Sequence, residues 1–175
     1  MEERKGLAFD EQLTVVGRML QPGEVAPNFL LDYLDLVDMA VRTVDLTDSA
    51  GMVRLLNVVN SLEWPLCQVV TSRWEALCAD LPPKTCLYTV SIDSPQTQAS
   101  FQETAGVLHQ ALSAHRSEQF GHDYGVWLKE WRRLSQAVFV IDRHERIVYT
   151  QYVADQRDEP DYVAALEALM QAPME

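Results

Sequence analysis

The sequence predicts an α/β fold in which helices flank a central mixed sheet that carries an N-terminal β-hairpin extension. Four short stretches rich in β-branched and aromatic residues predict strands. Three amphipathic segments between or after them predict helices, which gives the order β-α-β-α-β-β-α. Because 175 residues with 47% apolar content suffice for one hydrophobic core, we expect a single domain over residues 1–175.

The predicted strands cover residues 53–59, 86–92, 137–141 and 147–153. The third is almost entirely apolar, which is typical of a strand buried on both faces of a sheet. A short polar turn separates the third strand from the fourth, so we expect a hairpin there. The first two strands are connected through a helix, as parallel neighbours are.

The first predicted helix, residues 66–79, places four apolar side chains on one stripe: Leu66, Val70, Trp74 and Leu77. Two consecutive prolines at 82–83 prevent the helix from continuing. Ser94 and Pro95 have the form of an N-cap followed by a first helical residue, and they open the second helix, from 96 to about 108.

The last helix opens at residues 159–161, and its inner face is expected to hold Val163, Leu166, Leu169 and Met170. A parallel first pair with a terminal hairpin and helices on both faces is the thioredoxin fold. Residues 13–46 predict further N-terminal strands or a hairpin added to the sheet. Residues 107–135 are polar with a helical tendency.

Composition excludes several classes of function. Fourteen basic against 26 acidic residues give a net charge of −12, which disfavours binding to nucleic acid or to an anionic membrane. The sequence has no apolar run of about 20 residues and no secretory signal at its N-terminus, so we expect a cytoplasmic protein without a membrane segment. The three cysteines and four histidines have no metal-ligand spacing, and we expect neither metal nor cofactor.

The candidate nucleophile lies where the first strand leads into the first helix, at residues 60–67. Pro65 suits a first helical turn, which places Cys67 inside that turn. The positive end of the helix dipole there stabilises a thiolate and lowers its pKa. The alternative is that Cys67 is a small buried apolar residue. Cys78 and Cys86 lie within or beside apolar runs and are expected to be structural.

From about residue 13 to 169 the sequence resembles the thiol peroxidase branch of the peroxiredoxins, the atypical 2-Cys type. The matching motifs occur in the family's order: LTVVG at 13–17, GEVAPNF at 23–29, LNVV at 56–59 followed by SLE at 61–63, VSID at 90–93, YGV at 124–126, AVFVID at 137–142 and EPDYVAAL at 159–166.

This resemblance implies that Cys67 attacks the terminal oxygen of a hydroperoxide and becomes a sulfenic acid. It also implies a homodimer. The family surrounds its reactive Cys with a Pro, a Thr or Ser, and an Arg, but here Asn60, Trp64 and Gln136 stand at those positions. Gln102 stands where the family has its resolving Cys.

No replacement for the missing groups is evident from the sequence. Arg73 is nearly opposite Cys67 on the same helix, and Arg132 and Arg133 are too far along an extended segment. Cys78 is about 16 Å further along the helix, beyond the ~7 Å that a disulfide allows. An external thiol, either a thioredoxin-like protein or a low-molecular-weight thiol, would therefore have to reduce oxidised Cys67.

Two hypotheses remain open. In the first, the chain is a thiol peroxidase that works in a one-Cys manner through Cys67 with weakened activity. In the second, it is a catalytically inactive peroxiredoxin-fold protein that serves as a binding, sensing or structural module. The segment 127–133, rich in Trp and Arg, is either a partner-binding surface or a loop that packs its Trp residues over the Cys67 pocket beside Trp64.

Overall fold

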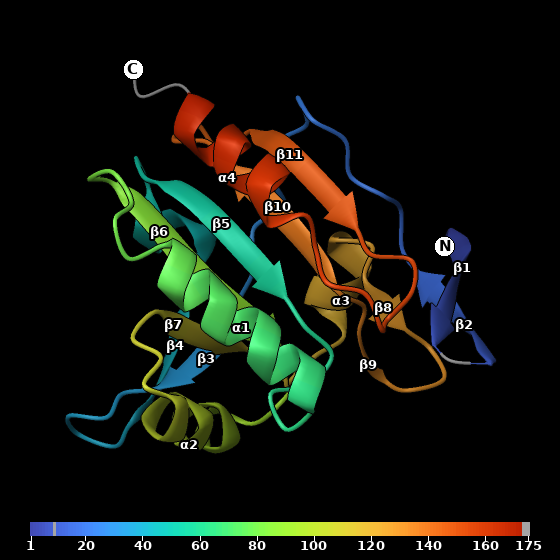
Figure 1. The fold of residues 1–175 in the computed structure, drawn as a ribbon, viewed down its shortest axis with the longest axis horizontal. Coiled ribbons are helices and arrows are strands. Elements are labelled where there is room, and N and C mark those ends of the chain that lie inside the picture. Colours follow the sequence, from blue (N-terminus) through green and yellow to red (C-terminus); the bar gives the residue numbers. More distant parts are fainter. Residues whose placement is uncertain (9, 173–175) are drawn as a thin grey trace.

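The computed structural model describes residues 1–8 and 10–172, and this part forms a large and a small β-sheet with four α-helices (Figure 1). The strands are β1 (Glu3–Ala8), β2 (Glu11–Val16), β3 (Leu31–Leu34), β4 (Val41–Val44), β5 (Val53–Val58), β6 (Thr85–Ser91), β7 (Gln110–Ser113), β8 (Trp127–Leu128), β9 (Arg133–Leu134), β10 (Ala137–Ile141) and β11 (Ile147–Tyr152). The helices are α1 (Pro65–Leu77), α2 (Pro95–Ala105), α3 (Gln119–Asp123) and α4 (Tyr162–Gln171).

The large sheet has seven strands in the order β11-β10-β5-β6-β7-β3-β4. Strands β5, β6 and β7 run parallel, and β10 pairs antiparallel with β5 and with β11. The predicted parallel pair, the terminal hairpin and the thioredoxin-like α/β fold are confirmed. Because parallel strands end at one edge, the segments that follow β5, β6 and β7 meet there, and Cys67 belongs to the first of them.

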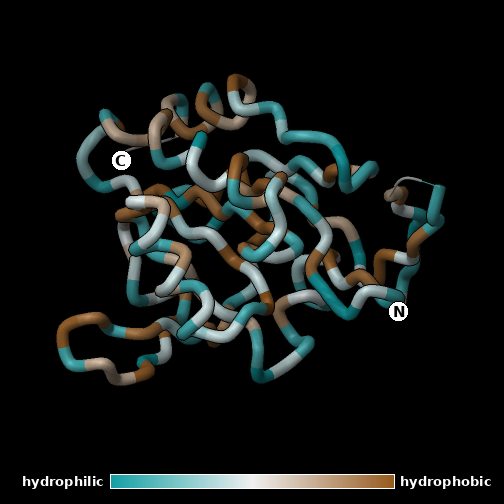
Figure 2. Tube along the Cα trace, turned by 60° about the horizontal axis from the view of Figure 1, so that its bottom comes forward, coloured by the Kyte–Doolittle hydropathy of each residue, from teal (hydrophilic) through white to brown (hydrophobic). Residues whose placement is uncertain are grey.

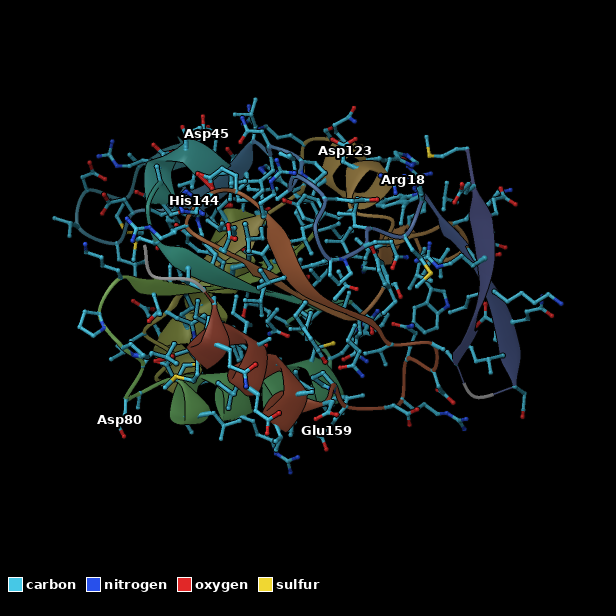
Figure 3. The ribbon with its side chains drawn as sticks, turned by 90° about the horizontal axis from the view of Figure 1, so that it is seen from above. Arg18, Asp45, Asp80, Asp123, His144 and Glu159 are labelled. Carbon is cyan, nitrogen blue, oxygen red and sulfur yellow. The ribbon has the colours of Figure 1, made fainter. Side chains whose placement is uncertain are left out.

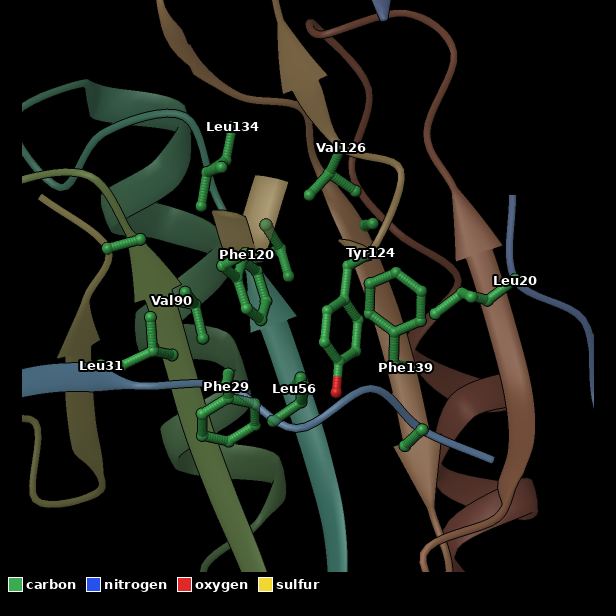
Figure 4. Close-up of a cluster of buried hydrophobic side chains, with 14 of the residues drawn as sticks. Leu20, Phe29, Leu31, Leu56, Val90, Phe120, Tyr124, Val126, Leu134 and Phe139 are labelled. Atoms are coloured by element: carbon green, nitrogen blue, oxygen red, sulfur yellow. The ribbon is translucent and has the colours of Figure 1, made fainter. Parts of the chain in front are cut away.

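Apolar side chains fill both faces of this sheet. On one face, α1 and α4 cover the middle strands, and Trp74 of α1 and Leu169 of α4 pack with Val138 and Leu55. On the other face, α3 and the N-terminal segment supply an aromatic cluster. Figure 4 shows Phe29, Phe120 and Tyr124 from these segments beside strand residues such as Phe139.

The structure corrects the prediction for residues 107–135. Instead of a mainly helical segment, it contains β7, the short helix α3, and the two-residue strands β8 and β9. β7 extends the parallel part of the sheet between β6 and β3. A four-residue strand is too short to give a clear periodic pattern, and it forms because β6 offers an open edge with matching register.

The N-terminal extension divides into two hairpins. β3 and β4 complete the large sheet, as predicted, whereas β1 and β2 form a separate sheet with β8 and β9. The first hairpin also begins earlier than residue 13, at Glu3. Main-chain bonds from Leu7 to Ala154 and from Gln156 to Leu7 hold it against the segment that follows β11.

Two predicted helix faces need correction. In α1, Val70 and Trp74 are buried, but Leu77 is 46% exposed. In α4, Leu169 is buried and Leu166 is partly buried, as predicted, but Val163 and Met170 are exposed and Ala165 is the other buried residue. Ala165 and Leu169 are four residues apart and therefore lie on one face of the helix.

Charged side chains such as Asp80, Asp123 and Glu159 lie around the periphery of the molecule (Figure 3). Figure 2 shows the loop between β3 and β4 projecting from the fold, with several hydrophobic residues along it. Leu36, Val37 and Met39 of this loop are exposed. Within the described residues, no helix has the length and apolar character needed to cross a membrane.

Candidate active site

Cys67 lies in the first turn of α1, as predicted. Trp64 is the N-cap and has an extended backbone, and Pro65 is the first helical residue. A backbone N–H at this position has no acceptor within the helix, so proline, which lacks that N–H, costs no hydrogen bond there. The backbone N–H of Trp64 donates to Ser61 O at 3.1 Å, which forms a turn between β5 and the helix. The chain therefore enters α1 with Cys67 close to the carboxyl end of β5.

The surroundings of Cys67 disfavour its thiolate form. Its side chain is 1% exposed, and burial raises the pKa of the thiol above its ordinary value. Backbone N–H groups of Ser61 and Asn60 oppose this pKa rise, whereas the nearby Asp93 carboxylate adds to it. The expectation of a lowered pKa is thus wrong, because desolvation of the thiolate outweighs the backbone N–H groups that would stabilise it.

A pocket with a volume of about 560 Å³ opens at Cys67. Its lining is mainly apolar and comes from four parts of the chain: Ala8, Asn60, Trp64, Pro65, Leu66, Cys67, Trp131, Gln156 and Arg157. Such a volume lies within the range of about 300–1,000 Å³ found for small-molecule sites. The buried sulfur is therefore adjacent to a space that can hold a small organic molecule.

Two indole rings form a wall of this pocket. Trp64 and Trp131 pack edge to face with ring centroids 5.3 Å apart. The interpretation that the 127–133 segment packs over the pocket beside Trp64 is confirmed for Trp131. It is wrong for Trp127, which is 7% exposed and packs in the main core. Trp64 borders the pocket without closing it.

Neutral amides surround Cys67 on the sheet side. The Cys67 Sγ donates to Asn60 Oδ1 at 3.8 Å, and Asn60 Nδ2 donates to Leu134 O at 2.7 Å and to Gln156 Oε1 at 3.0 Å. Gln136 Nε2 donates to the carbonyls of Gln156 and Asp158. Gln136 therefore lies behind the lining, with its amide donor directed to backbone oxygens and not into the pocket.

Asp93 holds the loop that precedes α1. Its two carboxylate oxygens accept hydrogen bonds from Ser61 Oγ, the Leu62 N–H and Ser91 Oγ, each at 2.7 Å. The residue is 8% exposed, so these bonds are shielded from water. Sequence analysis did not assign this role to Asp93, although its position directly after β6 places it at the same sheet edge as Cys67.

Gln156 and Arg157 are pocket residues that sequence analysis missed. Arg157 bonds through Nε and Nη2 to Asp155 and lowers the pKa of that carboxyl to about 2. The predicted hairpin of the last two strands could have indicated the position of Gln156 and Arg157. The β10–β11 hairpin pairs Ala137 with Tyr152, so the residues after Tyr152 return to the Cys67 edge of the sheet.

The three arginines considered from sequence do not line the Cys67 pocket. Arg73 pairs with Glu159, and Arg132 pairs with Glu118 at 3.2 Å. Arg133 Nη1 donates to a backbone oxygen at 3.4 Å. Within the described chain, Arg157 is therefore the cationic residue that borders this pocket.

The remaining cysteines are remote from Cys67. Cys78 caps the far end of α1, and burial raises its pKa to about 12. Cys86 pairs in register with Arg54 near the start of β6, at the edge of the sheet opposite to Cys67. Gln102, at the expected resolving position, donates to His109 O at 2.7 Å. All three cysteines are free thiols.

A buried polar chain links α1 to the sheet away from the pocket. His109 Nδ1 contacts Glu75 Oε2 at 2.7 Å, and His109 Nε2 contacts Thr89 Oγ1 at 2.8 Å. Burial lowers the pKa of His109, although the Glu75 carboxylate opposes this effect. Among residues 1–8 and 10–172, no group of three His, Cys, Asp or Glu is arranged to hold a metal ion.

Comparison with known proteins assigns the family. The family model described as Redoxin matches residues 21–166. The thiol peroxidase of Halalkalibacterium halodurans is 40% identical over 89% of this chain and 91% of its own length. The chain belongs to the thiol peroxidase branch of the redoxin family. The thiol peroxidase of Bacillus subtilis is 32% identical over 89% of this chain and 90% of its own.

Solved structures of thiol peroxidases and peroxiredoxins share this fold. The peroxiredoxin-like protein from Aquifex aeolicus has a TM-score of 0.83 and 23% identity, and covers 98% of this chain and 99% of its own. The thiol peroxidase from Chromobacterium violaceum has a TM-score of 0.81 and 24% identity, with 98% of each chain covered. The expected thioredoxin-like fold is thereby confirmed.

For this thiol peroxidase family member, two of the three expected substrate positions border the pocket. Asn60 and Trp64 line it, whereas Gln136 is separated from it by Gln156. Asn60 Nδ2 is already engaged by two acceptors, and the indole of Trp64 offers a single N–H. Apart from Arg157, the described lining supplies no cation that would stabilise negative charge on a peroxide oxygen.

Proposed function

We propose that the chain reduces hydroperoxides with Cys67 as its nucleophile in a one-Cys cycle. The observation that carries the proposal is a cysteine in the first turn of α1 that borders an apolar pocket of about 560 Å³, within the thiol peroxidase family. The Cys67 thiolate attacks the terminal peroxide oxygen, the O–O bond breaks, and the alkoxide leaves as an alcohol after taking up a proton. Cys67 is left as a sulfenic acid.

The substrate best suited to this pocket is an organic hydroperoxide with an apolar body. Trp64, Trp131, Pro65 and Leu66 offer apolar surface on which such a body can lie. Hydrogen peroxide would gain nothing from these contacts, because it is small and fully polar.

The same proposal includes weakened activity. Burial raises the pKa of Cys67, which reduces the fraction of thiolate tenfold for each unit. The amides of Asn60 and Gln136 carry no charge, and loss of one charge-stabilising donor typically costs on the order of 100-fold in rate. An external thiol reduces oxidised Cys67 in this cycle, because Cys78 and Cys86 lie in other parts of the fold.

We also infer that the chain forms a homodimer and that it is located in the cytoplasm.

A second candidate function is an inactive binding or sensing module. Two observations favour it: Cys67 is a nearly inaccessible thiol with a raised pKa, and Asn60 engages it through a saturated network of neutral amides. In this case the pocket would bind a ligand without turnover.

The test is oxidation of the reduced protein by cumene hydroperoxide, with the gain of one oxygen atom at Cys67 followed by mass spectrometry. We expect Cys67→Ser to abolish peroxide consumption. Cys86→Ser, which removes another thiol with a burial-raised pKa, serves as the matched control and should retain it. Residual turnover in Cys67→Ser would mean that the nucleophile is wrong. Oxidation no faster than that of free cysteine at the same pH would favour the inactive module.

A further inference from the structure

A second pocket lies directly beside the Cys67 pocket. It has a volume of about 630 Å³ and is lined by residues from the same edge of the sheet and from the β8–β9 hairpin: Ile92, Ala114, His115, Arg116, Ser117, Glu118, Trp127, Trp131, Arg132 and Arg133. Trp131 lines both pockets and therefore contributes to the wall of each pocket.

The charge of this second pocket is opposite to that of the chain. Three of its lining residues are arginines and one is a glutamate, although the chain carries a net charge of −12. Arg132 is paired with Glu118 at 3.2 Å, and Arg116 is paired with Asp32 at 2.6 Å, where His115 also contacts Asp32 at 2.9 Å. Two of the three guanidinium groups are thus already neutralised in part.

Arg133 is the third guanidinium, and it has no ion pair among the described residues. Its Nε is buried without a hydrogen-bond partner, and its Nη1 makes a single long bond of 3.4 Å to Arg132 O. A guanidinium presents five N–H donors arranged to bind carboxylates in a bidentate manner. Because the described residues give Arg133 no carboxylate partner, a carboxylate of an anionic ligand in this pocket could form an ion pair with its guanidinium group.

The second pocket lies at the same edge of the sheet as Cys67, where a thiol that reduces oxidised Cys67 would have to bind. Ile92 follows β6 and Ala114 follows β7, so both lie at the edge of the sheet where Cys67 follows β5. Ligands of open α/β sheets bind at this carboxyl edge. An oxidised Cys67 needs a thiol from outside the chain, and a site for that thiol has to lie close to the Cys67 pocket.

We propose that this second pocket binds the carboxylate groups of an anionic low-molecular-weight thiol, which reduces oxidised Cys67 past the edge of Trp131. The inference rests on the proposed function and adds the class of reductant. The thiol attacks the Cys67 sulfenic acid, an S–S bond forms, and the S–O bond breaks with release of water. A second molecule of the thiol then attacks this mixed disulfide, which regenerates Cys67 and releases the small-molecule disulfide.

The test compares thiols of different charge on protein oxidised with one equivalent of cumene hydroperoxide. Mercaptosuccinate carries two carboxylates, 2-mercaptoethanol is neutral and cysteamine is cationic. Reduction is followed by rapid-mixing fluorescence of the tryptophans, with rates expressed per thiolate so that differences in thiol pKa are removed. We expect a preference on the order of tenfold for mercaptosuccinate over 2-mercaptoethanol, equivalent to about one charge-assisted interaction of 1.4 kcal/mol.

Variants assign this preference to the pocket. Arg133→Gln should bring the ratio of the mercaptosuccinate rate to the 2-mercaptoethanol rate close to one. Arg18→Gln removes an exposed, ion-paired arginine outside both pockets and should leave the ratio unchanged. Succinate, which has the carboxylates but no thiol, should slow reduction by mercaptosuccinate and not by 2-mercaptoethanol at matched ionic strength.

The possible failures are distinguishable. If peroxide does not oxidise Cys67 at all, the proposed function fails before any thiol is added. If Cys67 is oxidised but wild-type protein shows no preference for mercaptosuccinate, only the present inference is overturned. A preference that persists in Arg133→Gln, or that succinate does not affect, would overturn the assignment to this pocket.

Discussion

Replacing Asp93 by Asn tests how the Cys67 loop is held. Asp93 Oδ1 accepts from Ser61 Oγ, and Oδ2 accepts from the Leu62 N–H and Ser91 Oγ, all at 2.7 Å. An asparagine has the same shape, and its single carbonyl oxygen can still accept from Leu62 and Ser91. Its amide nitrogen would donate to Ser61 Oγ, so the contact survives with its direction reversed.

The expected cost follows from the loss of charge. Each hydrogen bond to a charged group contributes roughly 1.5–3 kcal/mol, against roughly 0.5–1.5 kcal/mol for a neutral bond. Three bonds that each weaken by about 1 kcal/mol predict that Asp93→Asn lowers the free energy of unfolding by about 3 kcal/mol. This is a large share of the roughly 5–15 kcal/mol that stabilises a typical domain.

Urea denaturation measures this loss. Asp161→Asn is the matched control, because Asp161 is the exposed N-cap of α4 and Asn caps a helix equally well, so its effect should stay within about 0.5 kcal/mol. Alkylation of Cys67 at fixed pH should become faster in Asp93→Asn, since an anion that raises the Cys67 pKa is removed. A loss of stability below about 1 kcal/mol, or an unchanged alkylation rate, would refute the reasoning.

Two further predictions concern titration and the pocket cation. Burial lowers the pKa of His109, so the native state takes up this proton less readily than the unfolded state, and stability should fall as pH drops below the unfolded value of about 6.5. His109→Gln should flatten that slope in denaturation curves measured from pH 7 to 5, and an unchanged slope would argue against the assignment. Arg157→Gln should slow oxidation of Cys67 by peroxide and weaken its dependence on ionic strength. Arg73→Gln removes a similarly exposed, ion-paired arginine outside the pocket and should do neither, and equal effects of the two variants would count against a role for Arg157.

Patterns that repeat along the chain allowed correct prediction of the central elements. The apolar stretches that predicted β5, β6, β10 and β11 matched the observed strands to within about a residue, because these strands are rich in β-branched and aromatic residues. Of the four, β5 and β10 are buried along their whole length. Cys67 was located in the first turn of α1 because Pro65 marks that turn locally. β7 was missed because its four residues are too few for a periodic signal.

The direction of the Cys67 pKa shift could not be read from local sequence. The helix dipole is a local property and predicts a lowered pKa, but burial depends on which distant segments cover the sulfur. Here these include Ala111 of β7, which packs against Cys67 in a small apolar cluster. Arg157 reaches the pocket for a similar reason: the β11 strand returns the chain to this edge.

The amino-acid sequence by itself determined the thioredoxin-like fold, the family and the place of Cys67 at a helix start, because each depends on local patterns and motifs. Only the tertiary structure decided that Cys67 is desolvated, that Arg157 and not Arg132 or Arg133 borders its pocket, and that a cationic pocket adjoins it across Trp131. The physical reason is that desolvation and the charge of a pocket are sums over side chains brought together from remote parts of the chain.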